Sequence, residues 1–173
     1  MKNIESLSIR ARVAYGTLCL EKALNNHHHD DKNEAWQFVL DKFWLFTNIE
    51  YVDEWLYIIS KIMPDSILDD DFNEESGITL EEHKRLKKLY KSTPQFIFDI
   101  MEGIFNCGRR HLYSAVTPHS PETVEFIKSI KKIMSSNKIE MPKLGDLKKY
   151  SINEHQGWGT TFERKDLFKI EAK

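Results

Sequence analysis

The sequence predicts an all-α, single-domain protein, a bundle of about six helices followed by an irregular C-terminal tail. Three observations support this prediction. The chain of 173 residues has only seven glycines and five prolines, too few for the many tight turns of a sandwich or barrel. Apolar residues recur at three- and four-residue steps over most of the first 136 positions. Hydrophobic residues make up 40% of the chain, which indicates a packed core rather than disorder.

The first half of the chain predicts three helices. The first, over about 4–25, carries a helical stripe formed by Ile4, Leu7, Ala11, Ala14 and Leu18. The second follows the polar residues 25–31 and turns one side inward with Trp36, Val39, Leu40, Phe43 and Thr47. Residues 47–50 resemble a capping box, in which a hydroxyl and a carboxylate satisfy free backbone amides, and predict the start of the third helix. Pro64 ends this helix, whose stripe is Val52, Trp55, Leu56, Ile59, Ile62 and Met63.

The second half predicts three more helices. A second capping box, Thr79-Leu80-Glu81-Glu82, opens a helix to about Lys91. Pro94 stands at the favoured first position of the next helix, whose inward residues are Ile97, Ile100, Met101, Ile104 and Phe105. Ser120-Pro121-Glu122-Thr123 opens the last long helix, which buries Val124, Ile127, Ile130, Ile133 and Met134. Beyond it the periodicity weakens, and we expect an irregular tail with a short helix over 144–150.

We interpret residues 1–173 as one domain, with a helical core over about 4–136 and a tail over 137–173 packed on it. Charged residues make up 30% of the chain but nearly balance, at a formal −2, so net charge predicts neither nucleic-acid nor membrane binding. Cys19 and Cys107 lack CxxC spacing, which favours a reduced cytoplasmic protein. No apolar run has the length of a signal peptide or a membrane span, so we expect a cytoplasmic location.

The segment that is most informative about function covers residues 64–82, which we call the acidic segment. It contains eight acidic residues, no Lys or Arg, and the apolar residues Ile67, Leu68, Phe72, Ile78 and Leu80. A disordered acidic linker is poor in apolar side chains, so this composition favours a surface that steers a basic protein partner and then buries anchors. The candidate partner-binding residues are Asp65, Asp69, Asp70, Asp71, Phe72 as the anchor, Glu74 and Glu75. The alternative is a loop kept soluble by charge, or a cap on its own basic helix.

No catalytic or metal-binding motif stands out from the sequence. His27-His28-His29-Asp30-Asp31 offers metal ligands, but adjacent loop residues do not all converge on one ion, and a solvated loop explains them better. Cys107 and His111 would need spatial proximity to act as nucleophile and base, and a packed thiol is the simpler interpretation. Asp69-Asp70-Asp71 lacks the further carboxylates of a magnesium site. We therefore expect no metal and no cofactor.

Two further features have structural explanations. The predicted helix over 79–91 carries four lysines on one face, but the preceding acidic segment would repel phosphate, so we expect no nucleic-acid partner. In the tail, Trp158 lies between two glycines and Phe162 follows closely. We interpret both rings as plugs of a segment strapped across the bundle rather than as a ligand site.

Several short segments together carry a family resemblance. They are Ala11–Gly16 and Leu18–Ala23 near the start, Leu112-Tyr113-Ser114, and Gly157-Trp158-Gly159 followed by Phe162, beside the tryptophan-rich second and third helices. This ensemble resembles small α-helical bacterial immunity proteins, which are partners of secreted polymorphic toxins. The resemblance implies a non-enzymatic protein that binds a cognate toxin, such as a basic toxin domain, and occludes its active site. Two other classes stay open: a regulatory or scaffold domain that binds proteins, and a metal-dependent enzyme that uses carboxylates and histidines.

Overall fold

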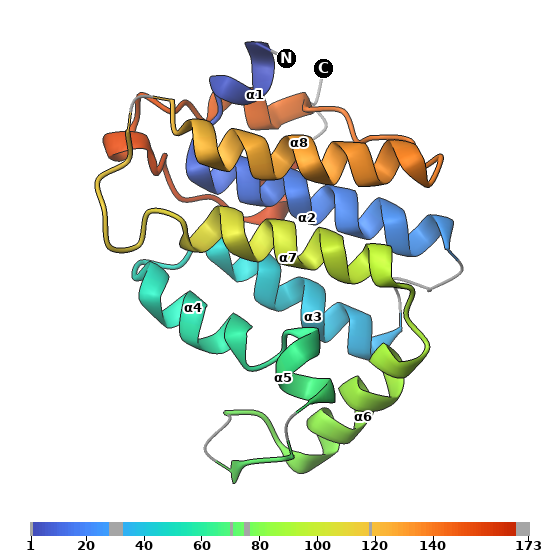
Figure 1. Cartoon of the computed structure of the whole chain (residues 1–173). Helices are drawn as coiled ribbons and strands as arrows, with labels where there is room; N and C mark the ends of the chain where they lie inside the picture. The colour runs from blue at the N-terminus through green and yellow to red at the C-terminus, as the bar shows by residue number, and fades with distance from the viewer. Residues whose placement is uncertain (1, 28–32, 70, 75–76, 118, 169–173) are drawn as a thin grey trace.

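The computed structural model describes residues 2–27, 33–69, 71–74, 77–117 and 119–168 and is shown in Figure 1. Six helices of nine or more residues confirm the predicted all-α, single-domain bundle: α2 (Ile9–Asn26), α3 (Glu34–Trp44), α4 (Val52–Ser60), α6 (Leu80–Lys91), α7 (Gln95–Arg109) and α8 (Pro121–Ser136). Shorter elements are α1 (Lys2–Glu5), α5 (Pro64–Leu68) and the 3-10 turns η1 (Leu45–Thr47), η3 (Gly145–Lys149), η4 (His155–Gly157) and η5 (Arg164–Leu167). The described residues contain no β-strand, only an isolated antiparallel bridge between Leu7 and Ser151.

The central element of the fold is α2, which packs against α3, α7 and α8 and lies between α7 and α8 in Figure 1. Fourteen of its eighteen residues are buried, so it is enclosed on nearly all sides rather than on one stripe. Gly16 permits the close approach of α7, because a Cβ at this position would lie 2.9 Å from Cγ1 of Ile104. A larger residue there would push the two helices apart.

The predicted first helix over 4–25 is interrupted, because the tail enters between α1 and α2. The Ile152 amide donates to the Ser6 carbonyl, and the Ser8 amide donates to the Tyr150 carbonyl. Ser8 then starts α2 as its N-cap, and its Oγ accepts from the Ala11 amide at 3.2 Å. The apolar stripe continues across the break because both pieces face the same core.

The capping box predicted at 47–50 is wrong. The Thr47 hydroxyl donates backwards to the Trp44 carbonyl at 2.9 Å and so belongs to η1, while α4 begins later, at Val52, without a side-chain cap. Pro64 follows the predicted stripe but also begins α5. The box at Thr79 and Glu82 is confirmed in both directions, and so is the start of α8 at Pro121.

The tail lies along the bundle and contributes buried side chains to the core. Phe162 is buried and its ring stacks on Tyr150 with centroids 3.9 Å apart. The Phe162 amide donates to the Thr47 carbonyl, and the Arg10 amide donates to the Trp158 carbonyl, which fastens the tail to η1 and to α2. Among the described helices, none is both long enough and apolar enough to cross a membrane.

Candidate functional site

The acidic segment lies at one end of the bundle, where it runs from α5 to the start of α6 (Figure 1). Much of its apolar content serves the fold. Ile67 is fully buried, and Leu68 and Ile78 pack against the core. The half-buried Phe72 places its ring edge-on to His83 of α6, with centroids 5.7 Å apart. The predicted anchor therefore already contacts its own chain, as the alternative of a cap on the basic helix requires.

The charged side chains of the acidic segment point to solvent. Asp65, Asp69, Asp71 and Glu74 are exposed, and no ion pair between described residues involves any of the four. Asp70 and Glu75 lie outside the described residues. The Glu82 carboxylate is turned instead to the α6 N-terminus, where hydrogen bonding to the Thr79 backbone lowers its pKa.

Exposed carboxylates and tyrosines also lie at α4, the helix that precedes the acidic segment. Asp53 and Glu54 are exposed, and so are Tyr51 and Tyr57, with 58% and 56% of their surface accessible. α4 meets α5 at its C-terminal end, where the Ser66 hydroxyl of α5 donates to the Ser60 carbonyl at 2.7 Å, whereas Asp53 and Glu54 lie in the first turn of α4. We call the acidic surface the set Asp53, Glu54, Tyr57, Asp65, Asp69, Asp71 and Glu74.

The sequence contained a signal for the α4 part that the acidic segment alone did not reveal. Between Lys42 and Lys84 lie eleven acidic residues and a single Lys or Arg, Lys61. The Lys61 ammonium lies over the Tyr57 ring, 5.3 Å from its centroid. On the neighbouring helix, Arg85 pairs with Glu34 of α3 at 3.2 Å rather than with the acidic segment. Among the described residues, no ion pair neutralises a carboxylate of the acidic surface.

The histidine-rich loop and the candidate metal ligands add no described site. His27 is exposed and its ring lies 4.6 Å from that of Phe96, while the rest of the motif, 28–31, falls outside the described residues. Within the described ranges, no three His, Cys, Asp or Glu side chains gather closely enough to hold a metal ion.

Cys107 is a packed thiol in the structure. Burial raises its pKa to about 12, which keeps the sulfur protonated, and Sγ lies 4.0 Å from the Thr123 carbonyl. The partner of His111 is instead Ser120, whose Oγ lies 2.7 Å from Nε2. This pair has the spacing of a base and a nucleophile, but Ser120 is fully buried, so no substrate reaches its hydroxyl. The pair could not be predicted, because eight residues lie between His111 and Ser120 and no motif links them.

A buried arginine completes this cluster. Arg12 is fully buried, and its guanidinium bridges the end of α1 and the turn that precedes α8. All five of its N–H groups donate, to the carbonyls of Ile4, Glu5, His119 and Ser120 and to Oγ1 of Thr123. His119 and Ser120 hold left-handed backbone conformations, with φ of 62° and 39°. The cluster is thus a polar joint that holds a strained turn.

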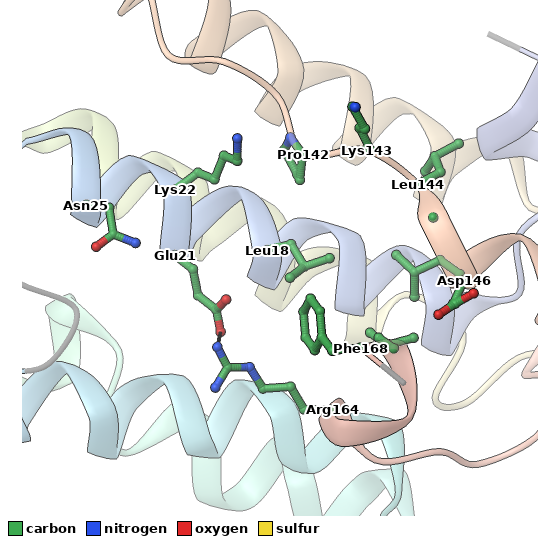
Figure 2. Close-up of a pocket in the computed structure, with 13 residues that line it drawn as sticks. Leu18, Glu21, Lys22, Asn25, Pro142, Lys143, Leu144, Asp146, Arg164 and Phe168 are labelled. Atoms are coloured by element: carbon green, nitrogen blue, oxygen red, sulfur yellow. Dashed lines mark ion pairs between the residues drawn. The ribbon is translucent and has the colours of Figure 1, made fainter. Parts of the chain in front are cut away.

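A groove of about 530 Å³ lies between α2 and the residues of η3 and η5. Figure 2 shows Arg164 reaching across it to Glu21. The Glu21 carboxylate is nearly buried and accepts from Arg164 Nη2 at 3.1 Å and from Trp44 Nε1 at 2.7 Å. With its charge neutralised and Leu18 and Phe168 beside it, this groove joins the tail to α2 and α3 rather than presenting reactive groups.

Comparisons of the chain with family models, with curated proteins and with solved structures found no match. The functional interpretation therefore depends on the geometry of the chain itself. Of the features described so far, only the acidic surface combines exposure, charge of one sign and exposed tyrosines.

Proposed function

We propose that the protein is a non-enzymatic binding protein that neutralises a cognate bacterial toxin by occluding the toxin's active site. The observation that carries the proposal is the acidic surface: its carboxylates are exposed and lack ion-pair partners among the described residues. A basic partner would be steered to it at long range and would supply the missing countercharges. The resemblance to immunity proteins supplies the class of partner.

The exposed tyrosines support a protein as the ligand of this surface. Tyr57 lies within the surface and Tyr51 beside it, and both have more than half of their area accessible. Tyrosine is enriched at the centres of protein interfaces, because it buries a large ring at low entropic cost and keeps a hydroxyl for hydrogen bonding. Carboxylates around such rings fit the charged rim that surrounds an interface core.

The first experiment identifies the partner and its activity. The protein is immobilised, exposed to lysate and concentrated medium of its source cells, and the captured chains are identified by mass spectrometry. Each captured chain is then expressed in a test cell with and without this protein. Growth arrest by the partner that this protein relieves supports the proposal. A captured partner that is harmless to growth contradicts it and favours a regulatory or scaffold domain.

The second experiment locates the binding surface with two matched variants. Asp71→Asn with Glu74→Gln removes two charges from the acidic surface, and Asp99→Asn with Glu102→Gln removes two exposed charges from α7. At low ionic strength we expect the first variant to associate with the toxin roughly two- to tenfold more slowly than the second. The difference should shrink at high salt. Equal association rates for the two variants would refute the assignment of this surface.

A further inference from the structure

A second cavity, distinct from the acidic surface, lies where the tail crosses the start of α2. It measures about 430 Å³ and is bounded by Arg10 of α2, by Glu50 and Val52 at the start of α4, and by His155, Trp158 and Thr160 of the tail. We call it the Arg10 pocket. Its volume falls in the range of small-molecule sites, and its walls combine an indole ring and a valine with a few polar groups.

The guanidinium of Arg10 is buried over the Phe46 ring, with Cζ 5.9 Å from the ring centroid, and makes one hydrogen bond. Only 6% of the residue is exposed, and Nη1 donates to the Phe46 carbonyl at 2.5 Å. Nε is buried with no hydrogen-bond partner, and no described residue accepts from Nη2 or forms an ion pair with Arg10. Burial also lowers its pKa. An unpaired buried N–H or charge destabilises a protein, so such a group at the wall of a pocket is a candidate for a ligand contact.

Arg12 shows that this fold can satisfy a buried arginine fully. It stands two residues from Arg10 on the same helix and has an acceptor for each of its five N–H groups. Arg10 has one acceptor, on the Nη1 side. Nε is enclosed by protein atoms, so Nη2 is the donor that remains for a ligand in the Arg10 pocket.

We propose that the Arg10 pocket binds the carboxylate of a small organic acid. The acid group would pair with Arg10, while its apolar body would lie against Trp158 and Val52. A carboxylate fits better than a phosphate because Glu50 lines the same pocket and its negative charge opposes a dianion more strongly than a monoanion. This inference stands apart from the proposed function, because it uses none of the acidic surface.

The backbone of the tail at the pocket is held in a strained form. His155 and Gln156 have φ of 44° and 56°, in the left-handed region that residues other than glycine seldom adopt. Strain of this kind clusters at ligand sites, where the surrounding structure holds it in place. His155 and Trp158 of this turn line the Arg10 pocket. The next residue, Gly159, lies so close to Ser8 that a side chain at this position would clash.

The test is a titration of the ¹⁵N-labelled full chain at constant ionic strength, followed by the indole N–H signal of Trp158. The signal is assigned with Trp158→Phe, and the probes are acetate, benzoate and inorganic phosphate. We expect benzoate to produce a saturable shift and phosphate none, with acetate binding more weakly because it lacks an apolar body. A phosphate shift equal to that of benzoate, or no saturable shift with either carboxylate, overturns the proposal.

Two variants identify the binding group. Arg10→Lys keeps the charge but removes the planar guanidinium and its fixed Nη2 donor, so we expect benzoate to bind about tenfold more weakly. Glu50→Gln changes an exposed carboxylate and should strengthen benzoate binding severalfold, which tests the site even if Arg10→Lys fails to fold. Arg164→Lys, in the other groove, is the control and should leave benzoate affinity unchanged. Benzoate affinity that is the same in Glu50→Gln as in the wild type, or that falls as much in Arg164→Lys as in Arg10→Lys, overturns the assignment.

Discussion

Replacing Arg12 with lysine tests how much the buried polar joint contributes to stability. Arg12 has five donors and five acceptors, at distances from 2.5 Å to 3.3 Å. A lysine ammonium has three donors on a single nitrogen, so at least two of these acceptors lose their partner. Each buried polar group left unsatisfied costs about 1–3 kcal/mol.

The structure narrows this range. The Ile4 carbonyl also accepts from the Leu7 amide, and the Ser120 carbonyl also accepts from Thr123 Oγ1, so two of the five acceptors stay partly satisfied without Arg12. We therefore expect Arg12→Lys to lower the free energy of unfolding by about 2–4 kcal/mol. For a chain of this length that corresponds to a melting temperature lower by roughly 5–15 °C.

The assay is urea unfolding followed by circular dichroism, with Arg10→Lys as the matched control. Arg10 makes a single side-chain hydrogen bond, so its replacement should cost about 1 kcal/mol or less. Hydrogen exchange should quicken at the start of α8 in Arg12→Lys and stay slow there in Arg10→Lys. Equal destabilisation by the two variants would refute the distinction between a structural Arg12 and an underused Arg10.

The remaining predictions concern buried ionisable groups and the tail. Burial raises the pKa of Cys19 and Cys107 to about 12, so intact mass should show neither thiol alkylated by iodoacetamide in native protein near pH 8, and both alkylated in urea. In the folded protein the pKa of each thiol is raised from 9.0 to about 12, and the pKa of Tyr15 from 10.0 to about 12. The folded state therefore holds these protons more tightly than the unfolded state does. The contribution of these groups to the free energy of unfolding should be complete below about pH 9 and be lost as the pH rises towards 12. A urea midpoint that stays constant from pH 9 to pH 12 contradicts this expectation. In Gly159→Ala the new Cβ would clash with the Ser8 side chain at a φ of 81°, and we expect the free energy of unfolding in urea to fall by about 2–4 kcal/mol. An unchanged urea midpoint would mean that the tail does not need this close approach.

Parts of the fold were predictable because local chemistry is sufficient to form them. Thr79 and Glu82 hold the reciprocal bonds of a capping box whatever lies elsewhere in the chain. The interruption before α2 was not predictable, because the Ile152 amide, far along the chain, donates to the Ser6 carbonyl. Contacts of that kind leave no trace in the periodicity of the first 25 residues, which reads as one continuous helix.

The candidate site was predictable in its charge but not in its apolar contacts. The exposed carboxylates followed from the composition of the acidic segment, because charged groups without partners stay in water. Whether an apolar residue such as Ile67 is an anchor for a partner or part of the core depends on packing that sequence does not reveal. The structure places Ile67 in the core, so the proposed function depends on the charge and on Tyr57 of α4 with the preceding Tyr51.

Arg10 and Arg12 are separated by one residue, and helix geometry explains why Arg12 has five hydrogen-bond acceptors and Arg10 has one. Successive helix residues turn by about 100°, so Arg10 and Arg12 point to nearly opposite sides of α2. One side meets α1 and the turn before α8, where carbonyls converge on Arg12. The other side meets η1 and the tail, where Phe46 offers a single carbonyl to Arg10 and a cavity lies beside it. If the carboxylate titration succeeds, the second arginine is a binding group that sequence analysis had no means to distinguish from its neighbour.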